Sequence, residues 1–503
     1  MNAQTILRLA LIGTVIAVFT HTRADPDLWG HVRFGHDIAV QHRIPDVDPY
    51  SFTSDRAWIN HEWLAECVMA IAYRAAGPAG LIALKVLLLA AMAVLIAHGL
   101  RTEGVGDRAR DLLIGVVVIG TIAQANHVRP QLFSLVMFAA LLWLLVTIAG
   151  GRTRAAWLVP PLMILWTNVH GGWILGVGVL VLWIAGGLVA GVRRTETIAL
   201  LAAGAVAIPA TLINPYGWRL WTFLHETVGF GRADITDWQP VYRMGAFFVV
   251  LWVSLVALAG AAVRRALAAG DVDVRRTTVV LTLAILAFRV NRLLAFLALA
   301  LVMLMGPALA SLLASRRTAR GAAASGRLAS ATAFAVAAAL LLGSAYAAAV
   351  NVRCVRVEPD GAPEADVTIF ALREHASGRM VTWFDWGEYA IWHLGRLRDD
   401  ASAGQAPAVK VSMDGRRETV YSDARVQEHL RFYFDPPVRR AFLDRWQPDY
   451  IWLPRRLPVV PALIGDGWVT LAAGDQSILL GRPGAATRGP SDARSALRCF
   501  PGP

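Results

Sequence analysis

The stretches ADPDLWGH at residues 24–31 and WINHEWLAE at residues 58–66 open and close a segment that follows the first hydrophobic run. This segment, from His21 to Glu66, holds five of the 12 histidines and eight of the 36 acidic residues of the chain. Ionisable groups gathered at a membrane face are costly to hold there, so they indicate a functional site. We therefore expect the chemistry in the first loop, residues 21–78.

The composition is that of a polytopic membrane protein. Of the 503 residues, 56% are hydrophobic and only 17% are charged, far from a soluble average. The net charge of +12 comes mostly from arginines, many of them in short clusters between apolar runs, as cytoplasmic loops require. Nucleic-acid binding is not expected, because no basic groove with interleaved aromatic residues appears.

Hydrophobic runs of bilayer length predict about eleven membrane spans. The first is a retained anchor, since no Ala-x-Ala cleavage site precedes Asp25. The runs fall near residues 4–20, 79–99, 111–126, 131–150, 156–169, 173–192, 197–213, 245–263, 277–291, 293–314 and 328–350.

Alternate connections between these runs carry the arginine clusters, which places the N-terminus in the cytoplasm of a cell whose inner (plasma) membrane the chain crosses repeatedly. The opposite connections are poor in arginine. An odd number of spans then puts the first loop and everything after residue 350 on the same, extracytoplasmic side. If the prediction has missed one span, the first loop and the residues after 350 lie on opposite sides of the membrane.

Residues 1–350 form the predicted transmembrane domain. From residue 351 to residue 503 the long apolar runs give way to short ones. Short apolar runs predict strands at 380–384, 409–413, 450–453, 468–472 and 477–480, with helices near 366–376, 388–394 and 426–434. Strands interleaved with helices predict an α/β domain with its own core. The predicted fold class is therefore mainly α, a transmembrane helical bundle with a C-terminal extracytoplasmic α/β domain.

Cys354 and Cys499 bracket this domain on an oxidising side, so we expect a disulfide between them.

Within the first loop, Asp25 and Asp27 follow the first span directly and His31 lies one helical turn beyond Asp27. A helix is expected from Trp63 to Ala76, broken by Gly77-Pro78 before the next span.

This order of parts resembles the GT-C superfamily of membrane glycosyltransferases. An anchor span is followed by Asp25-Pro26-Asp27, and His61-Glu62-Trp63-Leu64 stands where many members begin a juxtamembrane helix. The resemblance implies a polyprenyl-phosphate-linked sugar donor and a catalytic aspartate in the first loop. Many members have an adjacent Asp-Glu pair, whereas here two aspartates flank a proline, so the base remains either Asp25 or Asp27.

Past the last span, Trp383-Phe384-Asp385-Trp386-Gly387 resembles the Trp-Trp-Asp-Tyr-Gly motif of oligosaccharyltransferase catalytic subunits, which helps to bind the acceptor. Trp383 and Asp385 are thus candidate acceptor residues. A strand that ends in an aromatic turn is the simpler interpretation of the same five residues.

Sugar transfer from a phosphate needs a carboxylate to accept the acceptor's proton and cations to stabilise the leaving phosphate. Asp25 or Asp27 supplies the base in an inverting geometry, and His61 and Glu62 complete the catalytic set. The candidate phosphate-binding residues are Lys85, Arg129, Arg289 and Arg292.

Further candidates line the outer cavity: His31 in the first loop, and Asn168, His170, Asn214, Tyr216 and Asp237 in other outer loops. A divalent cation, Mg²⁺ or Mn²⁺, held by Asp25, Asp27 and His31 is a further expectation. Each residue also has a structural interpretation, as a helix cap, a lipid-facing cation or an interfacial turn.

Three functions compete at this stage. The first is a glycosyltransferase that uses a polyprenyl-phosphate-linked sugar. The second is a non-catalytic assembly or receptor protein that presents its C-terminal domain to a protein partner, which the sequence leaves unidentified. The third is a transporter or flippase of a lipid-linked substrate, against which stand the lack of an internal repeat and the few ionisable residues within spans.

Overall fold

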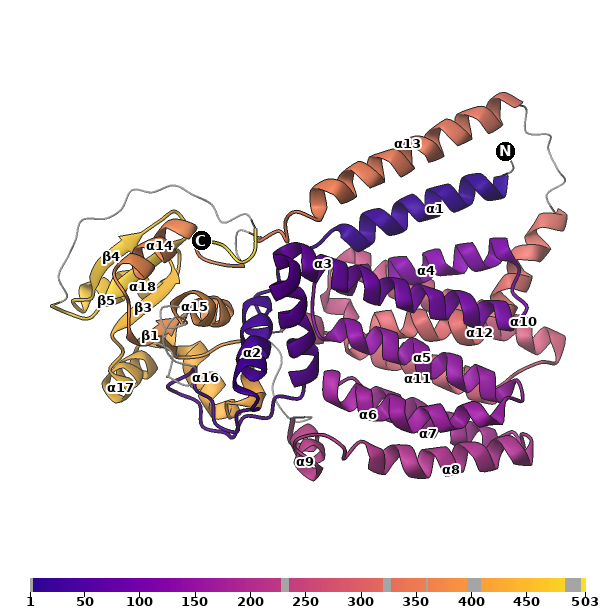
Figure 1. Ribbon diagram of the computed structural model, residues 1–503, viewed down its shortest axis with the longest axis horizontal. Helices are drawn as coiled ribbons and strands as arrows, with labels where there is room; N and C mark the ends of the chain where they lie inside the picture. Colours follow the sequence, from indigo (N-terminus) through magenta and orange to yellow (C-terminus); the bar gives the residue numbers. More distant parts are fainter. Residues whose placement is uncertain (1–2, 228–234, 320–326, 359–360, 396–408, 485–498) are drawn as a thin grey trace. The chain divides into compact units, whose positions relative to one another are not determined.

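The chain forms two compact units in the computed structural model, which describes residues 3–227, 235–319, 327–358, 361–395, 409–484 and 499–503. The helical unit comprises residues 1–22, 82–219 and 231–353, and the mixed unit comprises residues 23–81, 220–230 and 354–503. Figure 1 shows the helices of the first unit and the sheet of the second. The first loop therefore belongs to the same unit as the C-terminal residues.

Eleven helices in the described residues coincide with the eleven predicted hydrophobic runs. They are α1 (Ala3–Thr20), α3 (Trp63–Thr102), α4 (Asp107–Ala125), α5 (Gln131–Ala149), α6 (Val159–Val169), α7 (Trp173–Val189), α8 (Arg194–Ala210), α10 (Ala246–Ala269), α11 (Val274–Arg289), α12 (Leu294–Ala319) and α13 (Arg327–Asn351). Among the described residues, five helical stretches are long and apolar enough to cross a membrane. The protein is a multi-pass membrane protein.

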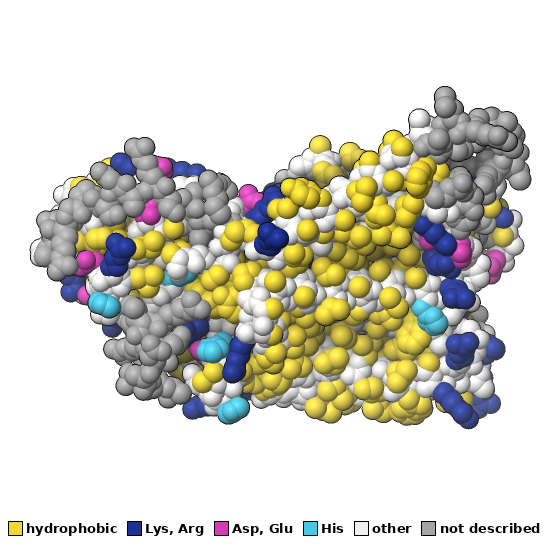
Figure 2. All heavy atoms as spheres, turned by 45° about the horizontal axis from the view of Figure 1, so that its top comes forward, with side chains coloured by type: hydrophobic (Ala, Val, Ile, Leu, Met, Phe, Trp, Pro, Cys, Tyr) yellow, Lys and Arg dark blue, Asp and Glu magenta, His cyan; other side chains and the backbone are white. Residues whose placement is uncertain are grey.

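The centre of the helical unit is formed by α5 and α12, in which 72% and 78% of the most apolar stretch is buried, against 17% for α10. The outer helices present their apolar side chains outward, and Figure 2 shows hydrophobic side chains covering this unit. A lipid environment accounts for such a surface, because water would leave it unstable.

Arginines at one end of the helical unit pair with acids that lie on neighbouring helices or directly after them. Arg8 of α1 contacts Asp107 and Asp111 of α4, and Arg276 of α11 pairs with Glu103. Arg276 belongs to a connection assigned to the cytoplasm, and Arg8 lies near the N-terminus, which is assigned to the same side. Figure 2 shows basic side chains gathered at one end of this unit.

The predicted break in the long third helix is confirmed. Ala76 and Gly77 have non-helical backbone angles, with Gly77 at φ 57°, a conformation that glycine adopts without steric cost. The segment that begins at Trp63 is thereby set off from the span that follows.

The mixed unit contains a five-stranded sheet that confirms the five predicted strands. The strands are β1 (Gly378–Thr382), β2 (Val409–Val411), β3 (Tyr450–Pro454), β4 (Val469–Ala473) and β5 (Ser477–Gly481). Their order is β2-β1-β3-β5-β4, with β1 parallel to β2 and β3, and β5 antiparallel to β3 and β4. A buried core that includes Phe432, Phe442 and Ile451 packs beside it.

The three predicted helices of this unit are found, together with two that the hydrophobic pattern did not indicate. The former are α14 (Ala365–Arg373), α15 (Gly387–Leu394) and α16 (Asp423–Phe432), and the latter are α17 (Pro436–Trp446) and α18 (Val459–Gly465). Asp435 accepts a hydrogen bond from Val438 N, and Pro436-Pro437 open α17. An aspartate cap followed by proline is a start signal that the apolar pattern alone does not reveal.

The first loop contributes a helix and an extra edge to the mixed unit. Helix α2 spans Leu28–Gln41. The segment Tyr50–Phe52 runs beside β2, because Val411 N donates to Tyr50 O and Phe52 N donates to Val411 O. A short helix, α9 (Trp218–Thr227), belongs largely to the same unit. The expected Cys354–Cys499 disulfide is also present.

Candidate active site

The two aspartates of the first loop occupy different environments. Asp25 is only 2% exposed, and its Oδ1 accepts a hydrogen bond from Asp27 N at 2.9 Å. Asp27 precedes α2 and is partly exposed, and within the described part of the chain its carboxylate makes no capping bond. Asp25 therefore shapes the turn, whereas the carboxylate of Asp27 remains available.

Asp27 faces acids that come from distant parts of the sequence. Glu388 of α15 is 3% exposed, and its Oε2 accepts a hydrogen bond from Gly30 N at 3.1 Å. A Cβ atom on Gly415 would overlap Asp27 Oδ1 and lie 3.1 Å from Glu388 Oε1. The two carboxyl groups thus approach the same point, and glycine leaves room for them.

Burial and neighbouring charge set the ionisation of this group. Burial raises the pKa of Asp27 to about 6, with His31 opposing the shift and Asp385 adding to it. Burial together with the charges of Asp27 and Asp414 raises the pKa of Glu388 well above its usual value. Asp27 is therefore ionised at neutral pH but poised to accept a proton, as a general base requires.

His31 lies one helical turn after Asp27, as predicted, and His31 N donates to Asp27 O at 2.9 Å. Its Nδ1 is 3.1 Å from Glu66 Oε1 and 3.9 Å from Glu62 Oε2. Burial lowers the pKa of His31, but the hydrogen bond to Glu66 and the nearby carboxylates outweigh it and raise the pKa to about 9. Asn60 Nδ2 holds Glu66 Oε2 at 2.5 Å.

A buried arginine joins the first loop to the residues after β2. Arg416 contacts Asp48 Oδ1 and Asp414 Oδ2, each at 2.7 Å. Its guanidinium also lies over the rings of Trp58, Phe34 and Tyr50, at 4.7, 4.9 and 5.3 Å. This network fixes Asp414 and the adjacent Gly415 beside Asp27.

The other residues proposed for this region make separate contacts, and of them Asp385 acts on Asp27. Asp385 belongs to a short 3₁₀ turn, Phe384–Trp386, that follows β1, and its charge acts on Asp27. Trp383 packs on Tyr433 at 4.7 Å. His61 contacts Glu62 at 3.5 Å and the Phe223 ring at 5.7 Å. The aromatic motif is thus a strand end, and it also brings an acid to the site.

Four proposed phosphate-binding residues lie in the helical unit. Lys85 is fully buried and donates to His21 O at 2.5 Å and Ala125 O at 2.9 Å. Arg129 pairs with Asp237 at 3.0 Å, and Arg292 lies 4.9 Å above the Trp238 ring. Arg289 is exposed at the end of α11. The structure brings Arg129, Asp237 and Arg292 together around one loop.

The remaining cavity candidates support turns in the backbone. Asn168 Nδ2 donates to Ile164 O and Ile213 O, each at 2.8 Å. His170 Nδ1 accepts from Gly172 N at 2.9 Å, and Asn214 Oδ1 accepts from Tyr216 N at 2.8 Å. These contacts satisfy buried backbone groups, which is a structural role.

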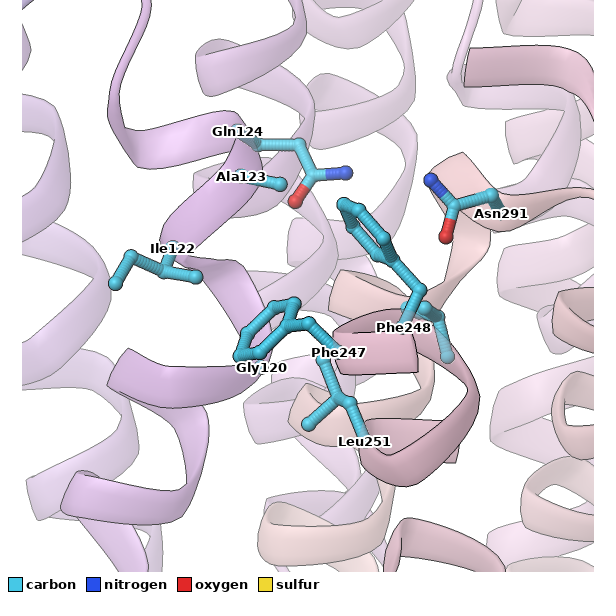
Figure 3. Close-up of a pocket in the computed structure, with 9 residues that line it drawn as sticks. Gly120, Ile122, Ala123, Gln124, Phe247, Phe248, Leu251 and Asn291 are labelled. Atoms are coloured by element: carbon cyan, nitrogen blue, oxygen red, sulfur yellow. The ribbon is translucent and has the colours of Figure 1, made fainter. Parts of the chain in front are cut away.

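A small pocket lies between α4, α10 and the start of α12 (Figure 3). Gln124 and Asn291 extend toward each other above Phe248, and the other walls are apolar. No water-sized sphere fits within it. We assign no chemistry to it.

Sequence reasoning missed Glu388, Asp414 and Arg416. They lie more than 350 positions from Asp27, and only the aromatic motif that precedes Glu388 pointed to that region.

Comparisons with known proteins bear on the fold. No protein-family model and no curated protein match the sequence. The solved structure of ArnT from Cupriavidus metallidurans, bound to undecaprenyl phosphate, is similar with a TM-score of 0.52 and 12% identity, over 95% of this chain and 97% of that chain. Arabinofuranosyltransferase AftD from Mycobacteria gives a TM-score of 0.50 at 15% identity, over 97% of this chain and 40% of AftD.

At such low identity these likenesses concern the fold, and the chemistry must be argued from the site itself. The match with ArnT covers both chains almost completely, and it includes the helices and the mixed unit alike. This chain therefore shares the fold of ArnT and AftD, in agreement with the fold that the resemblance to the GT-C superfamily implies.

Proposed function

We propose that this protein is a membrane glycosyltransferase that moves a sugar from a polyprenyl-phosphate-linked donor to an acceptor on the outer face of the plasma membrane. The observation that supports this most is Asp27, a partly exposed residue whose carboxylate lies among buried acids and has a pKa raised to about 6 by burial, in a GT-C fold. The N-terminus lies in the cytoplasm and the mixed unit outside.

Asp27 is the general base in this proposal. The acceptor hydroxyl oxygen attacks the anomeric carbon of the donor as the bond from that carbon to the phosphate oxygen breaks, and Asp27 takes the hydroxyl proton. Attack opposite the leaving group inverts the anomeric centre. The products are the glycosylated acceptor and polyprenyl phosphate. We assign this role to Asp27 rather than to Asp25, because the carboxylate of Asp25 is buried and accepts a hydrogen bond from the Asp27 amide.

Transfer is tested with the full chain in vesicles, supplied with polyprenyl-phosphate-linked hexose or pentose and an envelope extract as acceptor. We expect free polyprenyl phosphate and a labelled acceptor, measured by mass spectrometry. Movement of the lipid-linked sugar across the bilayer with neither product would contradict the proposal and favour a flippase.

The donor lipid is proposed to lie along α7 and α11. An apolar groove of about 380 Å³ runs between these helices and is lined by Leu175, Gly178, Val179, Val181, Leu182, Thr282, Leu283 and Leu286. Arg289 follows Leu286 by three residues on α11 and is exposed, so a chain in the groove places its phosphate near a guanidinium.

Replacing Arg289 with alanine is expected to weaken polyprenyl phosphate binding by about tenfold, because a charge-assisted contact is lost. Binding is measured by thermal stabilisation of the purified chain. Arg265→Ala, an exposed arginine at the other end of the helical unit, serves as the control. Equal stabilisation by uncharged polyprenol, or unchanged binding by Arg289→Ala, would place the phosphate elsewhere.

A divalent cation, Mg²⁺ or Mn²⁺, is proposed to bind within the mixed unit. Ligand atoms of His31, Glu62 and Glu66 all lie within 4.8 Å of one another, whereas the carboxylate of Asp25 is engaged by the Asp27 amide. We propose His31, Glu62 and Glu66 as the ligands. The cation would supply positive charge beside the acidic groups that surround Asp27.

Mn²⁺ is expected to raise the thermal stability of the chain, and to do so more strongly as pH rises toward 9. The reason is that the ion must displace the proton of His31, whose pKa is raised to about 9. At 100-fold excess over its dissociation constant, the ion would contribute about 2.7 kcal/mol. His31→Gln should lose the effect and His42→Gln, at the exposed end of α2, should keep it. Stabilisation that survives in His31→Gln would exclude this ligand set.

A further inference from the structure

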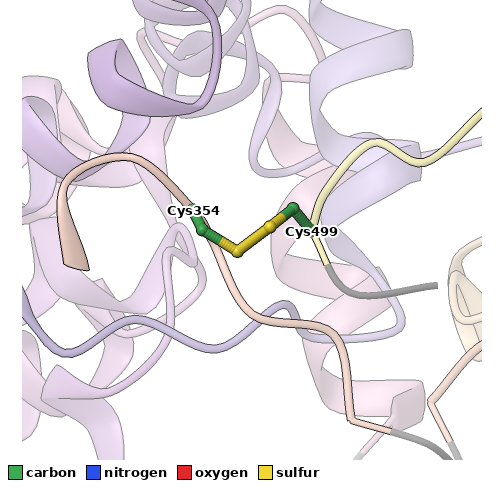
Figure 4. The surroundings of a disulfide bond; sticks show 2 residues. All are labelled: Cys354 and Cys499. Atoms are coloured by element: carbon green, nitrogen blue, oxygen red, sulfur yellow. A yellow bond between two sulfur atoms is a disulfide. The ribbon is translucent and has the colours of Figure 1, made fainter. Parts of the chain in front are cut away.

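The segment Cys499–Pro501 is bound to the strand-like residues that follow α13. Its disulfide to Cys354 is shown in Figure 4. Phe500 N donates to Val355 O at 2.9 Å, and Arg356 forms a β-bridge with Cys499. These contacts make the two segments a short cross-linked ribbon.

One side of this ribbon holds the chain just before the Asp25-Pro26-Asp27 turn. Ala24 N donates to Arg356 O at 2.6 Å, and Arg23 forms a parallel β-bridge with Arg356. Ala24 is buried. The entry to the turn is therefore fixed by backbone pairing to the disulfide-linked ribbon.

The other side of the ribbon holds the chain just after the turn. Trp29 Nε1 donates to Pro501 O at 2.8 Å, and His393 Nε2 of α15 donates to the same oxygen at 2.8 Å. The Phe500 ring, 1% exposed, contacts Trp29 at 5.3 Å, Tyr73 at 5.5 Å and Trp392 at 5.6 Å. Trp29 is two residues beyond Asp27.

We propose that Phe500 and Pro501, tied to Cys354 through Cys499, are positioning residues that hold the first turn of α2 so that Asp27 faces Glu388 and Gly415. Pro501 O receives one bond from α2 and one from α15, the helix that carries Glu388, so it fixes the spacing between the two carboxyl groups. The inference rests on the proposed role of Asp27 as the base. The position of the Asp25-Pro26-Asp27 turn can be measured without any substrate.

The test is hydrogen exchange of the full chain in detergent, read by mass spectrometry on peptides covering residues 24–41. Phe500→Ala is expected to speed exchange of the amides at the start of α2 by about tenfold, since local opening no longer breaks a buried aromatic contact. Phe434→Ala, an exposed phenylalanine of the same unit, is the matched control and should leave these rates unchanged. Phe500→Leu should restore most of the protection.

The disulfide gives a second, independent measurement. Cys354→Ser, Cys499→Ser and the double variant should all speed exchange at α2 to the same extent, because each removes the same bond. Unchanged exchange at α2 in these variants and in Phe500→Ala would overturn the proposal. Equal acceleration at α2 and at the central strand β3 would also overturn it, since it would indicate general unfolding.

These outcomes separate the inference from the proposed function. If the chain proves to transfer no sugar, exchange at α2 still reports whether Phe500 and Pro501 fix the turn. If transfer is shown but Phe500→Ala leaves α2 protected, only the positioning role fails. For an active chain, the role further predicts that Phe500→Ala lowers kcat for transfer while the affinity for polyprenyl phosphate stays unchanged.

Discussion

Asp27→Asn is expected to reduce sugar transfer by about 10²–10⁴-fold, the usual contribution of a general base. Asparagine matches aspartate in size but cannot accept the acceptor's proton at neutral pH. It also removes one carboxylate from a crowded group of acids, so the variant should fold at least as well as the parent. The measurement is the rate of polyprenyl phosphate release, with thermal unfolding as the check on folding.

Asp25→Asn is the matched control for this variant. Its side-chain oxygen can still accept the Asp27 amide, which Asp25 Oδ1 accepts at 2.9 Å, so most activity should remain. Asp25→Ala removes that acceptor and should lower activity by disturbing the turn. If Asp25→Asn is inactive while Asp27→Asn is active, the two aspartates have been assigned the wrong roles.

The same assignment sets the direction of the pH dependence. Asp27 accepts a proton only as the carboxylate, and its pKa is raised to about 6 by burial. The transfer rate should therefore be constant well above pH 6 and fall as pH is lowered through about 6. A profile that stays flat down to the usual carboxylate range would contradict the buried environment of this base.

Arg416→Met is expected to give the largest loss of stability, about 3–5 kcal/mol, because it leaves Asp48 and Asp414 buried without their cation. Both carboxylates contact Arg416 at 2.7 Å and both side chains are completely buried. Three aromatic rings also lose the charge above them. Thermal unfolding of the purified chain, followed by intrinsic fluorescence, measures the change.

Arg445→Met is the matched control for this prediction. Arg445 pairs with Glu428 at 3.1 Å, but its side chain is 59% exposed, and such surface pairs contribute about 0–1 kcal/mol. Arg416→Lys should be intermediate, since an ammonium cannot form the paired contacts of a guanidinium. Equal unfolding temperatures for Arg416→Met and Arg445→Met would mean that the buried network does not stabilise the unit.

Local patterns predicted much of the fold. Runs of apolar residues located the membrane helices, because a helix that faces lipid must be apolar along its length. The Gly77-Pro78 pair predicted the break in α3 from backbone sterics alone. Alternating short runs located the five strands of the mixed unit. Helix α17 was missed because its start is set by Asp435 and two prolines rather than by hydrophobicity.

Local patterns predicted only half of the candidate site. The sequence placed Asp25, Asp27 and His31 together because they are neighbours on one turn of chain. It could not choose between the two aspartates. That choice depends on which carboxylate accepts the hydrogen bond from the Asp27 amide and which one lies near Glu388. It also predicted that Lys85 binds phosphate. In the folded chain the Lys85 ammonium donates to the carbonyl oxygens of His21 and Ala125, at the ends of two helices.

The sequence by itself determined the membrane helices, the strands of the mixed unit and the acidic character of the first loop. Each of these features depends on the types and spacing of residues that are close together in the chain. Only the tertiary structure decided which acids meet and how strongly they perturb one another. Glu388, Asp414 and the Phe500–Pro501 segment reach Asp27 through sheet pairing, a disulfide and burial. Those interactions join residues hundreds of positions apart, and no local pattern in the chain records them.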